Sequence, residues 1–109
     1  WFSLIKARMR SSISEKLYAS SKGALEAFSK DTAREWGPMG IRSNVVVPGF
    51  MATAMSSTLT DDQRNKIYAR TSLKAATSIR SVAETVAFLL SEKAESITGQ
   101  NIHVDNGTI

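Results

Sequence analysis

The chain has 109 residues and a net charge of +4, with 42% hydrophobic and 22% charged residues. This composition is ordinary for one globular domain, and no apolar run approaches the roughly 20 residues that span a membrane. The sequence has no cysteine, which excludes a disulfide framework and a thiolate nucleophile and fits a reducing cytoplasm. With one histidine and no cysteine, it offers no convincing transition-metal cluster. The fourteen basic residues are scattered, which suits an anionic ligand and argues against nucleic-acid binding.

Two helices are predicted in the first third of the chain. Apolar residues at positions 2, 5 and 9, with bases between them, indicate an amphipathic helix. A longer helix of about five turns is predicted over 17–36, where apolar residues recur at steps of three and four. Gly37 and Pro38 end it. One side of this helix carries small residues that would let another helix approach closely, namely Ala19, Ser20, Gly23, Ala24 and Ala27.

Tyr18 and Lys22 are four residues apart in the longer helix. Because four residues make about one helical turn, the phenol and the ammonium should share one face, within reach of a common substrate or cofactor. A neighbouring cation stabilises the phenolate and so makes the phenol a better proton donor and acceptor at neutral pH. The spacing alone fits either a proton-transfer pair or a surface tyrosine beside a surface lysine.

Two strands are predicted, over 41–47 and 100–104. Three successive valines at 45–47 lack polar alternation, which is typical of a strand covered on both faces in a parallel sheet. In the second strand Ile102 and Val104 face one way and His103 faces the other, so a structural or interface role is expected for His103. Two strands do not complete a doubly wound sheet, so further strands are expected from elsewhere.

The segment 48–53 follows the carboxyl end of the first strand, where open α/β sheets place their ligands. Its proline fixes the chain's exit, and its glycine lets the backbone approach a flat ring. Pro-Gly alone usually marks a turn, whereas its position after a buried strand favours a ligand-binding loop. Residues that either line an acyl or aliphatic pocket or pack in an ordinary core are Met51, Met55, Leu59 and Ile67.

Two further helices are predicted from capping boxes. Thr60 to Gln63 should begin a helix that runs to about Arg70. Ser81 to Glu84 should begin another that ends near Glu92 or Lys93. Its expected buried stripe is Val82, Val86, Leu89 and Leu90.

The stretch LYASSKGAL, Leu17 to Leu25, resembles the active-site helix of the short-chain dehydrogenase/reductase family. The resemblance continues, in the family's order and near its spacing, through AREW at 33–36, GIRSNVVVPG at 40–49 and ITGQNIHVD at 97–105. It implies an α/β fold with a Rossmann-type doubly wound parallel sheet. Residues 1–109 would hold only the C-terminal part of that single domain. The N-terminal cofactor-binding half would be absent, with further segments missing after Arg10 and after Ser14.

The resemblance also implies roles for individual residues in hydride transfer between a nicotinamide cofactor and a carbonyl or alcohol. Tyr18 would protonate the carbonyl oxygen, and Lys22 would assist it and bind the nicotinamide ribose. Ser12 would polarise the substrate oxygen, but it lies only six residues before Tyr18, closer than in the family. Ser12 is therefore either that serine, at the end of a strand, or part of a serine-rich turn.

Four more positions match the family loop that packs on the nicotinamide: Pro48, Gly49, Met51 and Thr53. At the C-terminus the family's closing turn usually has glycine where Asn106 stands, and asparagine tolerates the same left-handed backbone.

Within the family the sequence looks most like 3-oxoacyl-acyl-carrier-protein reductases. We therefore predict an NADP-dependent cytoplasmic ketone reductase of fatty-acid synthesis, with NAD as the alternative cofactor and a small-molecule or carrier-bound carbonyl substrate. A homotetramer is expected, with no metal, nucleic-acid or membrane partner. One alternative is a related dehydrogenase acting on a sugar, steroid or small alcohol. The other is a non-catalytic remnant that only mediates assembly.

Overall fold

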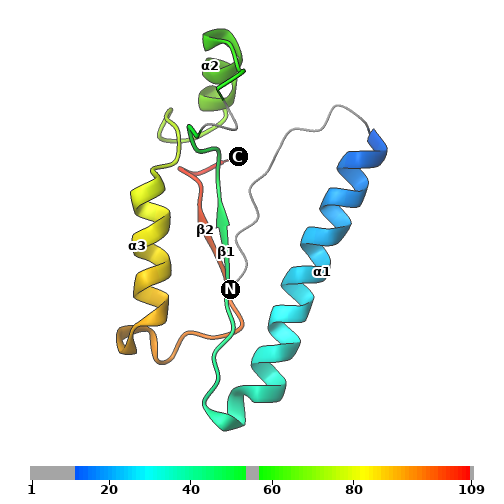
Figure 1. The fold of residues 1–109 in the computed structure, drawn as a ribbon, viewed down its shortest axis with the longest axis vertical. Coiled ribbons are helices and arrows are strands. Elements are labelled where there is room, and N and C mark those ends of the chain that lie inside the picture. Colours follow the sequence, from blue (N-terminus) through cyan, green and yellow to red (C-terminus); the bar gives the residue numbers. More distant parts are fainter. Residues whose placement is uncertain (1–11, 54–56, 109) are drawn as a thin grey trace.

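A two-stranded parallel sheet lies between two long helices (Figure 1). Strand β1 (Val45–Pro48) pairs with β2 (Asn101–Val104), and Val46 stands opposite Ile102. Parallel strands need a long crossover, and here it contains the helices α2 (Asp61–Ala69) and α3 (Ile79–Leu90). Both predicted strands are therefore found, with parallel pairing as expected for an α/β fold. The first strand begins at Val45 rather than at position 41 and ends one residue later than predicted, at Pro48.

The computed structural model describes residues 12–53 and 57–108. The helix predicted around positions 2–9 lies outside the described residues, as does Met55. The remaining elements are helix α1 (Ser12–Trp36) and two short 3-10 helices, η1 (Gly37–Met39) and η3 (Glu92–Ala94).

The core lies between the sheet and α3. All four residues of β1 are buried, as the run of valines predicts. Val46 packs there with residues from α3 and η3, namely Val82, Leu89 and Ala94. Ile102 and Val104 of β2 pack against the same cluster, whereas His103 is exposed. The predicted alternation of β2 is therefore confirmed.

Helix α1 is one continuous helix of 25 residues, and it ends where Gly37 and Pro38 predict. Near its C-terminal end, Ser29 is only 3% exposed and shares a 2.9 Å hydroxyl–hydroxyl hydrogen bond with Ser43. Phe28, in contrast, is 60% exposed. Toward its N-terminal end the helix leans away from the sheet (Figure 1). The rest of the described chain therefore holds α1 at one end.

Ser12 is the first residue of α1, so both of its expected places, the end of a strand and a serine-rich turn, are wrong. The helical path is unbroken from Ser12 to Tyr18. Each residue turns an α-helix by about 100°, so six residues place position 12 about 120° around the helix axis from position 18. The short spacing explains this result, because it leaves no room for a strand and a turn before the helix.

Helix α2 begins at the predicted capping box. The Thr60 hydroxyl accepts a hydrogen bond from the Gln63 amide, and the Gln63 side chain accepts one from the Thr60 amide. Asp61 and Asp62 occupy the first turn, where carboxylates favour the positive end of a helix. The helix ends at Ala69, one residue before the predicted limit.

Helix α3 begins earlier than predicted, because its N-cap is Ser78 rather than Ser81. The Ser78 hydroxyl accepts a hydrogen bond from the Ser81 amide. Glu84, the supposed partner in the box, instead pairs with Arg80 one turn before it, at 2.9 Å. The helix also ends earlier, at Leu90, which is 57% exposed rather than buried.

Three segments meet where the two strands end, and we call residues 49–50, 71–77 and 105–108 the strand-end junction. The Gly49 amide donates to the Val104 carbonyl at 2.9 Å, and the Thr77 amide donates to the Phe50 carbonyl at 2.7 Å. A Cβ on Gly49 would lie 2.7 Å from the Asp105 Cα and 2.6 Å from the Thr77 hydroxyl. Only glycine therefore allows the segments to approach this closely.

Replacing Gly49 with alanine should destabilise the protein, because the new methyl group meets backbone atoms that cannot rotate away. We expect Gly49→Ala to lower the free energy of unfolding by about 1–3 kcal/mol in urea denaturation. Gly23→Ala is the matched control, since no atom lies within 4 Å of a Cβ at Gly23 in α1. Helix propensity should make that variant more stable by about 0.5–1 kcal/mol. Equal stability of the two variants would contradict the close packing at Gly49.

The true N-cap of α3 can be identified by two serine substitutions. Ser78→Ala removes the acceptor for the Ser81 amide and should lower the free energy of unfolding by about 1 kcal/mol. Ser81→Ala keeps that acceptor, so its effect should stay within about 0.5 kcal/mol. Thermal denaturation followed by circular dichroism separates them. The reverse order of stabilities would place the N-cap at Ser81 instead.

Candidate active site

The structure brings Tyr18 and Lys22 onto one helix, one turn apart. Both side chains are partly exposed, and the unbroken α1 gives them the shared face that their spacing predicts. Between them, the Ser21 hydroxyl donates to the Tyr18 carbonyl at 2.8 Å and so folds back on the helix. This face can present a phenol and an ammonium to the same ligand.

The end of β1 and the loop that follows it contain the other predicted site residues. Pro48, the last residue of β1, is buried, while Gly49, Met51 and Thr53 in the loop are half-buried. Met51 packs against the hydrophobic core, which favours the packing role for this side chain over the pocket role. Leu59 and Ile67 are half-buried as well.

These two groups of predicted residues are not brought together in the described chain. Among the described elements α1 packs mainly against η1, which follows it. The N-terminal half of α1 leans away from the sheet (Figure 1). The residues on α1, Ser12 among them, are therefore separated from the loop at 48–53.

Gly49 proves to have a neighbour within the protein. We expected its missing side chain to make room for a flat ring, and the structure shows Asp105 and Thr77 at the place where a Cβ would stand. The Thr77 side chain is 3% exposed there. Close packing of the strand-end junction is thus sufficient reason for a glycine at this position.

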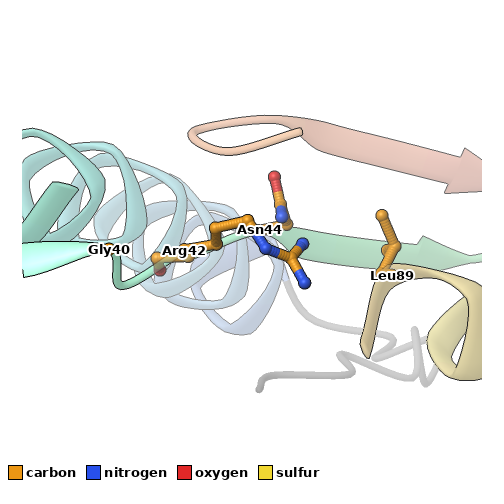
Figure 2. Close-up of a pocket in the computed structure, with 5 residues that line it drawn as sticks. Gly40, Arg42, Asn44 and Leu89 are labelled. Atoms are coloured by element: carbon orange, nitrogen blue, oxygen red, sulfur yellow. The ribbon is translucent and has the colours of Figure 1, made fainter. Parts of the chain in front are cut away.

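The opposite end of the sheet has a shallow hollow of about 230 Å³, lined by Gly40, Arg42, Ser43, Asn44 and Leu89 (Figure 2). Polar side chains that line this hollow already form hydrogen bonds within the protein. The Arg42 guanidinium donates to the Ile97 and Ser91 carbonyls at 3.4 Å each, and the Asn44 amide donates to the Ile97 carbonyl at 2.9 Å. Open α/β sheets bind ligands at their carboxyl end. We therefore infer that these side chains stabilise the start of β1 rather than bind a ligand.

Asn106 is the residue whose contacts the sequence did not reveal. Its φ of 56° confirms the left-handed backbone expected for it. Its side-chain amide also donates to the Ala75 and Ala76 carbonyls, at 2.9 and 3.0 Å. Both partners lie about thirty positions before Asn106 in the sequence, so no local pattern could have predicted these hydrogen bonds.

Two classes of site are not found in the described part of the chain. Residues 12–53 and 57–108 contain no group of three or more metal-ligating side chains. In the same ranges, the helices are too short or too polar to cross a lipid bilayer.

Comparison with known proteins identifies a family and relatives that match most of the chain. The family described as enoyl-(acyl carrier protein) reductase matches residues 2–108. The chain is 44% identical, over 90 residues, to the 3-oxoacyl-[acyl-carrier-protein] reductases FabG of Salmonella typhimurium and Escherichia coli K12. It is 40% identical to FabG of Staphylococcus epidermidis. Each match covers 83% of this chain and 37% of the relative.

The chain therefore spans little more than a third of the length of these relatives. The family match includes the helix with Tyr18 and Lys22, the two parallel strands and the closing turn. Together with the α/β arrangement, these findings show that the chain belongs to the short-chain dehydrogenase/reductase family.

Proposed function

We propose that this chain carries the proton-transfer residues of an NAD(P)-dependent oxidoreductase that reduces a ketone to an alcohol. The observation that carries the proposal is the placement of Tyr18 and Lys22 one turn apart on α1, in a chain with 44% identity to reductases of 3-oxoacyl groups. The names of those relatives support a 3-oxoacyl group on an acyl carrier protein as the substrate.

In this proposal Tyr18 donates its phenol proton to the carbonyl oxygen of the substrate. The Lys22 ammonium, one turn away, stabilises the phenolate that remains. The nicotinamide cofactor, when bound, supplies the hydride. In the reverse direction the phenolate accepts the proton of the alcohol.

The donor groups of this chain fit the nicotinamide end of such a cofactor. The Lys22 ammonium can bind the vicinal hydroxyls of a ribose, and the Thr53 hydroxyl and the backbone near Met51 can bind a carboxamide. The six glycines of the sequence are spread along it rather than gathered in a phosphate-binding loop. The described residues thus provide hydrogen-bond donors for the nicotinamide end of the cofactor. We propose NADP rather than NAD from the resemblance to 3-oxoacyl reductases.

We also propose that residues 1–109 are the C-terminal part of one Rossmann-type domain. The two-stranded sheet supports this, because among residues 12–53 and 57–108 each strand is paired along one edge only. The 37% share of the relatives' length supports it as well. Further strands beside β1 would extend the sheet and could bring α1 closer to the loop at 48–53.

Assembly into a cytoplasmic homotetramer belongs to the same proposal. The small residues on α1 support it, because Ala19, Ser20, Gly23, Ala24 and Ala27 are all exposed and would let a second helix approach closely. A non-catalytic protein that only assembles would use the same surface, so activity distinguishes the two functions.

Removal of one hydroxyl group tests the proton-transfer role. In the purified full-length protein, with NADPH and an acetoacetyl thioester, Tyr18→Phe should lower kcat roughly 100- to 10,000-fold, as expected for loss of a general acid. Tyr68→Phe is the matched control, because Tyr68 is the other tyrosine of the chain and lies on α2. The measurement is the loss of NADPH absorbance. Full activity of Tyr18→Phe, or no turnover by the folded full-length wild type, would refute the reductase.

The lysine can be tested through cofactor binding. Lys22→Ala removes a charged hydrogen-bond donor and should weaken NADPH binding to the full-length protein roughly 10- to 100-fold in a fluorescence titration. Lys30→Ala, two turns further along α1 and exposed, should change the Kd by about twofold or less. Equal affinities of the two variants would assign Lys22 to the surface rather than to the cofactor.

A further inference from the structure

Asn106 joins the turn after β2 to the segment between α2 and α3. Its side-chain amide donates to the Ala75 and Ala76 carbonyls, at 2.9 and 3.0 Å. Its backbone carbonyl accepts a hydrogen bond from the Leu73 amide at 3.2 Å. One half-buried residue thus makes three contacts with the segment at 73–76.

This segment leads directly to the loop at the carboxyl end of β1. Thr77 follows Ala76, and the Thr77 amide donates to the Phe50 carbonyl at 2.7 Å. The Phe50 ring lies 6.0 Å from the ring of Tyr68 on α2, centroid to centroid. Any shift of the Ala75 and Ala76 carbonyls would therefore reach both the loop and α2.

We infer that Asn106 is a positioning residue for the ligand-binding loop at 50–53. Its amide fixes residues 75–76, these fix Thr77, and Thr77 holds Phe50 at the start of the loop. Ligands of open α/β sheets bind at this end of the strands, while Asn106 acts through Thr77 rather than on the ligand. The effect on catalysis rests on the proposed reductase function, whereas the effect on the loop does not.

A left-handed backbone alone could also explain an asparagine at this position, because its φ is 56°. Two substitutions separate the explanations. Asn106→Gly keeps the backbone conformation, since glycine adopts positive φ freely, and loses the side-chain amide. Asn106→Asp keeps the shape and the tolerance of this backbone but cannot donate to the two carbonyls when ionised.

The first measurement is hydrogen exchange of backbone amides in the purified protein. Loss of two hydrogen bonds should speed exchange at the Thr77 amide about tenfold or more in both variants. Gln100→Ala is the matched control, because it removes an amide-to-carbonyl bond, to Thr98, at the other end of β2. That variant should leave exchange at Thr77 unchanged.

The second measurement is steady-state kinetics of the full-length protein with NADPH and an acetoacetyl thioester. A displaced loop weakens binding in the ground state and the transition state alike, so KM should rise about three- to tenfold while kcat stays within about twofold. A purely structural role would change the amount of folded enzyme and leave KM unaltered.

Wild-type exchange at Thr77 in both variants would overturn the inference. An Asn106→Gly variant with wild-type exchange at Thr77 and wild-type KM would also overturn it, because a left-handed backbone at this position would then be sufficient to hold the loop. If the wild-type protein reduces no ketone, the proposed function fails, and the exchange measurement still decides the role of Asn106.

Discussion

The parallel pairing of β1 with β2 determines where the segments that leave the two strands lie. Backbone hydrogen bonds extend past both ends of the paired strands, from the Val45 amide to the Gln100 carbonyl and from the Gly49 amide to the Val104 carbonyl. Because the strands run in the same direction, both carboxyl ends reach the same edge of the sheet. The segments that follow the strands must therefore meet there, and Gly49 makes the meeting sterically possible.

The two ends of this sheet contact different parts of the chain. At the amino end, Ser43 binds Ser29 of α1 through its hydroxyl and the Gly99 amide through its carbonyl, so this end anchors α1. At the carboxyl end, the strand-end junction holds the loop at 50–53 and the start of α3. Tyr18 and Lys22 lie toward the N-terminal end of α1, which leans away from the sheet (Figure 1). In the proposed function, contacts beyond the described residues bring the pair to the loop.

Local signals predicted the elements well and their limits less well. The capping box at Thr60 was sufficient to place α2, because both of its hydrogen bonds join residues three apart. The same pattern at Ser81 was misleading, since Ser78 offers an equivalent hydroxyl one turn earlier and Glu84 pairs with Arg80 instead. Ser12 was misplaced because a resemblance to a strand end conflicted with a spacing that continues the helix.

The sequence by itself determined the two strands, the long helix with its stop at Gly37, and the one-turn spacing of Tyr18 and Lys22. These features depend on residues within about four positions of each other, where periodicity and capping act. Only the tertiary structure decided that Gly49 faces Asp105, that the Asn106 amide holds Ala75 and Ala76, and that α1 is separated from the loop after β1. The contacts of Gly49 and Asn106 join residues about thirty or more positions apart. Their geometry follows from strand pairing and packing rather than from any local pattern.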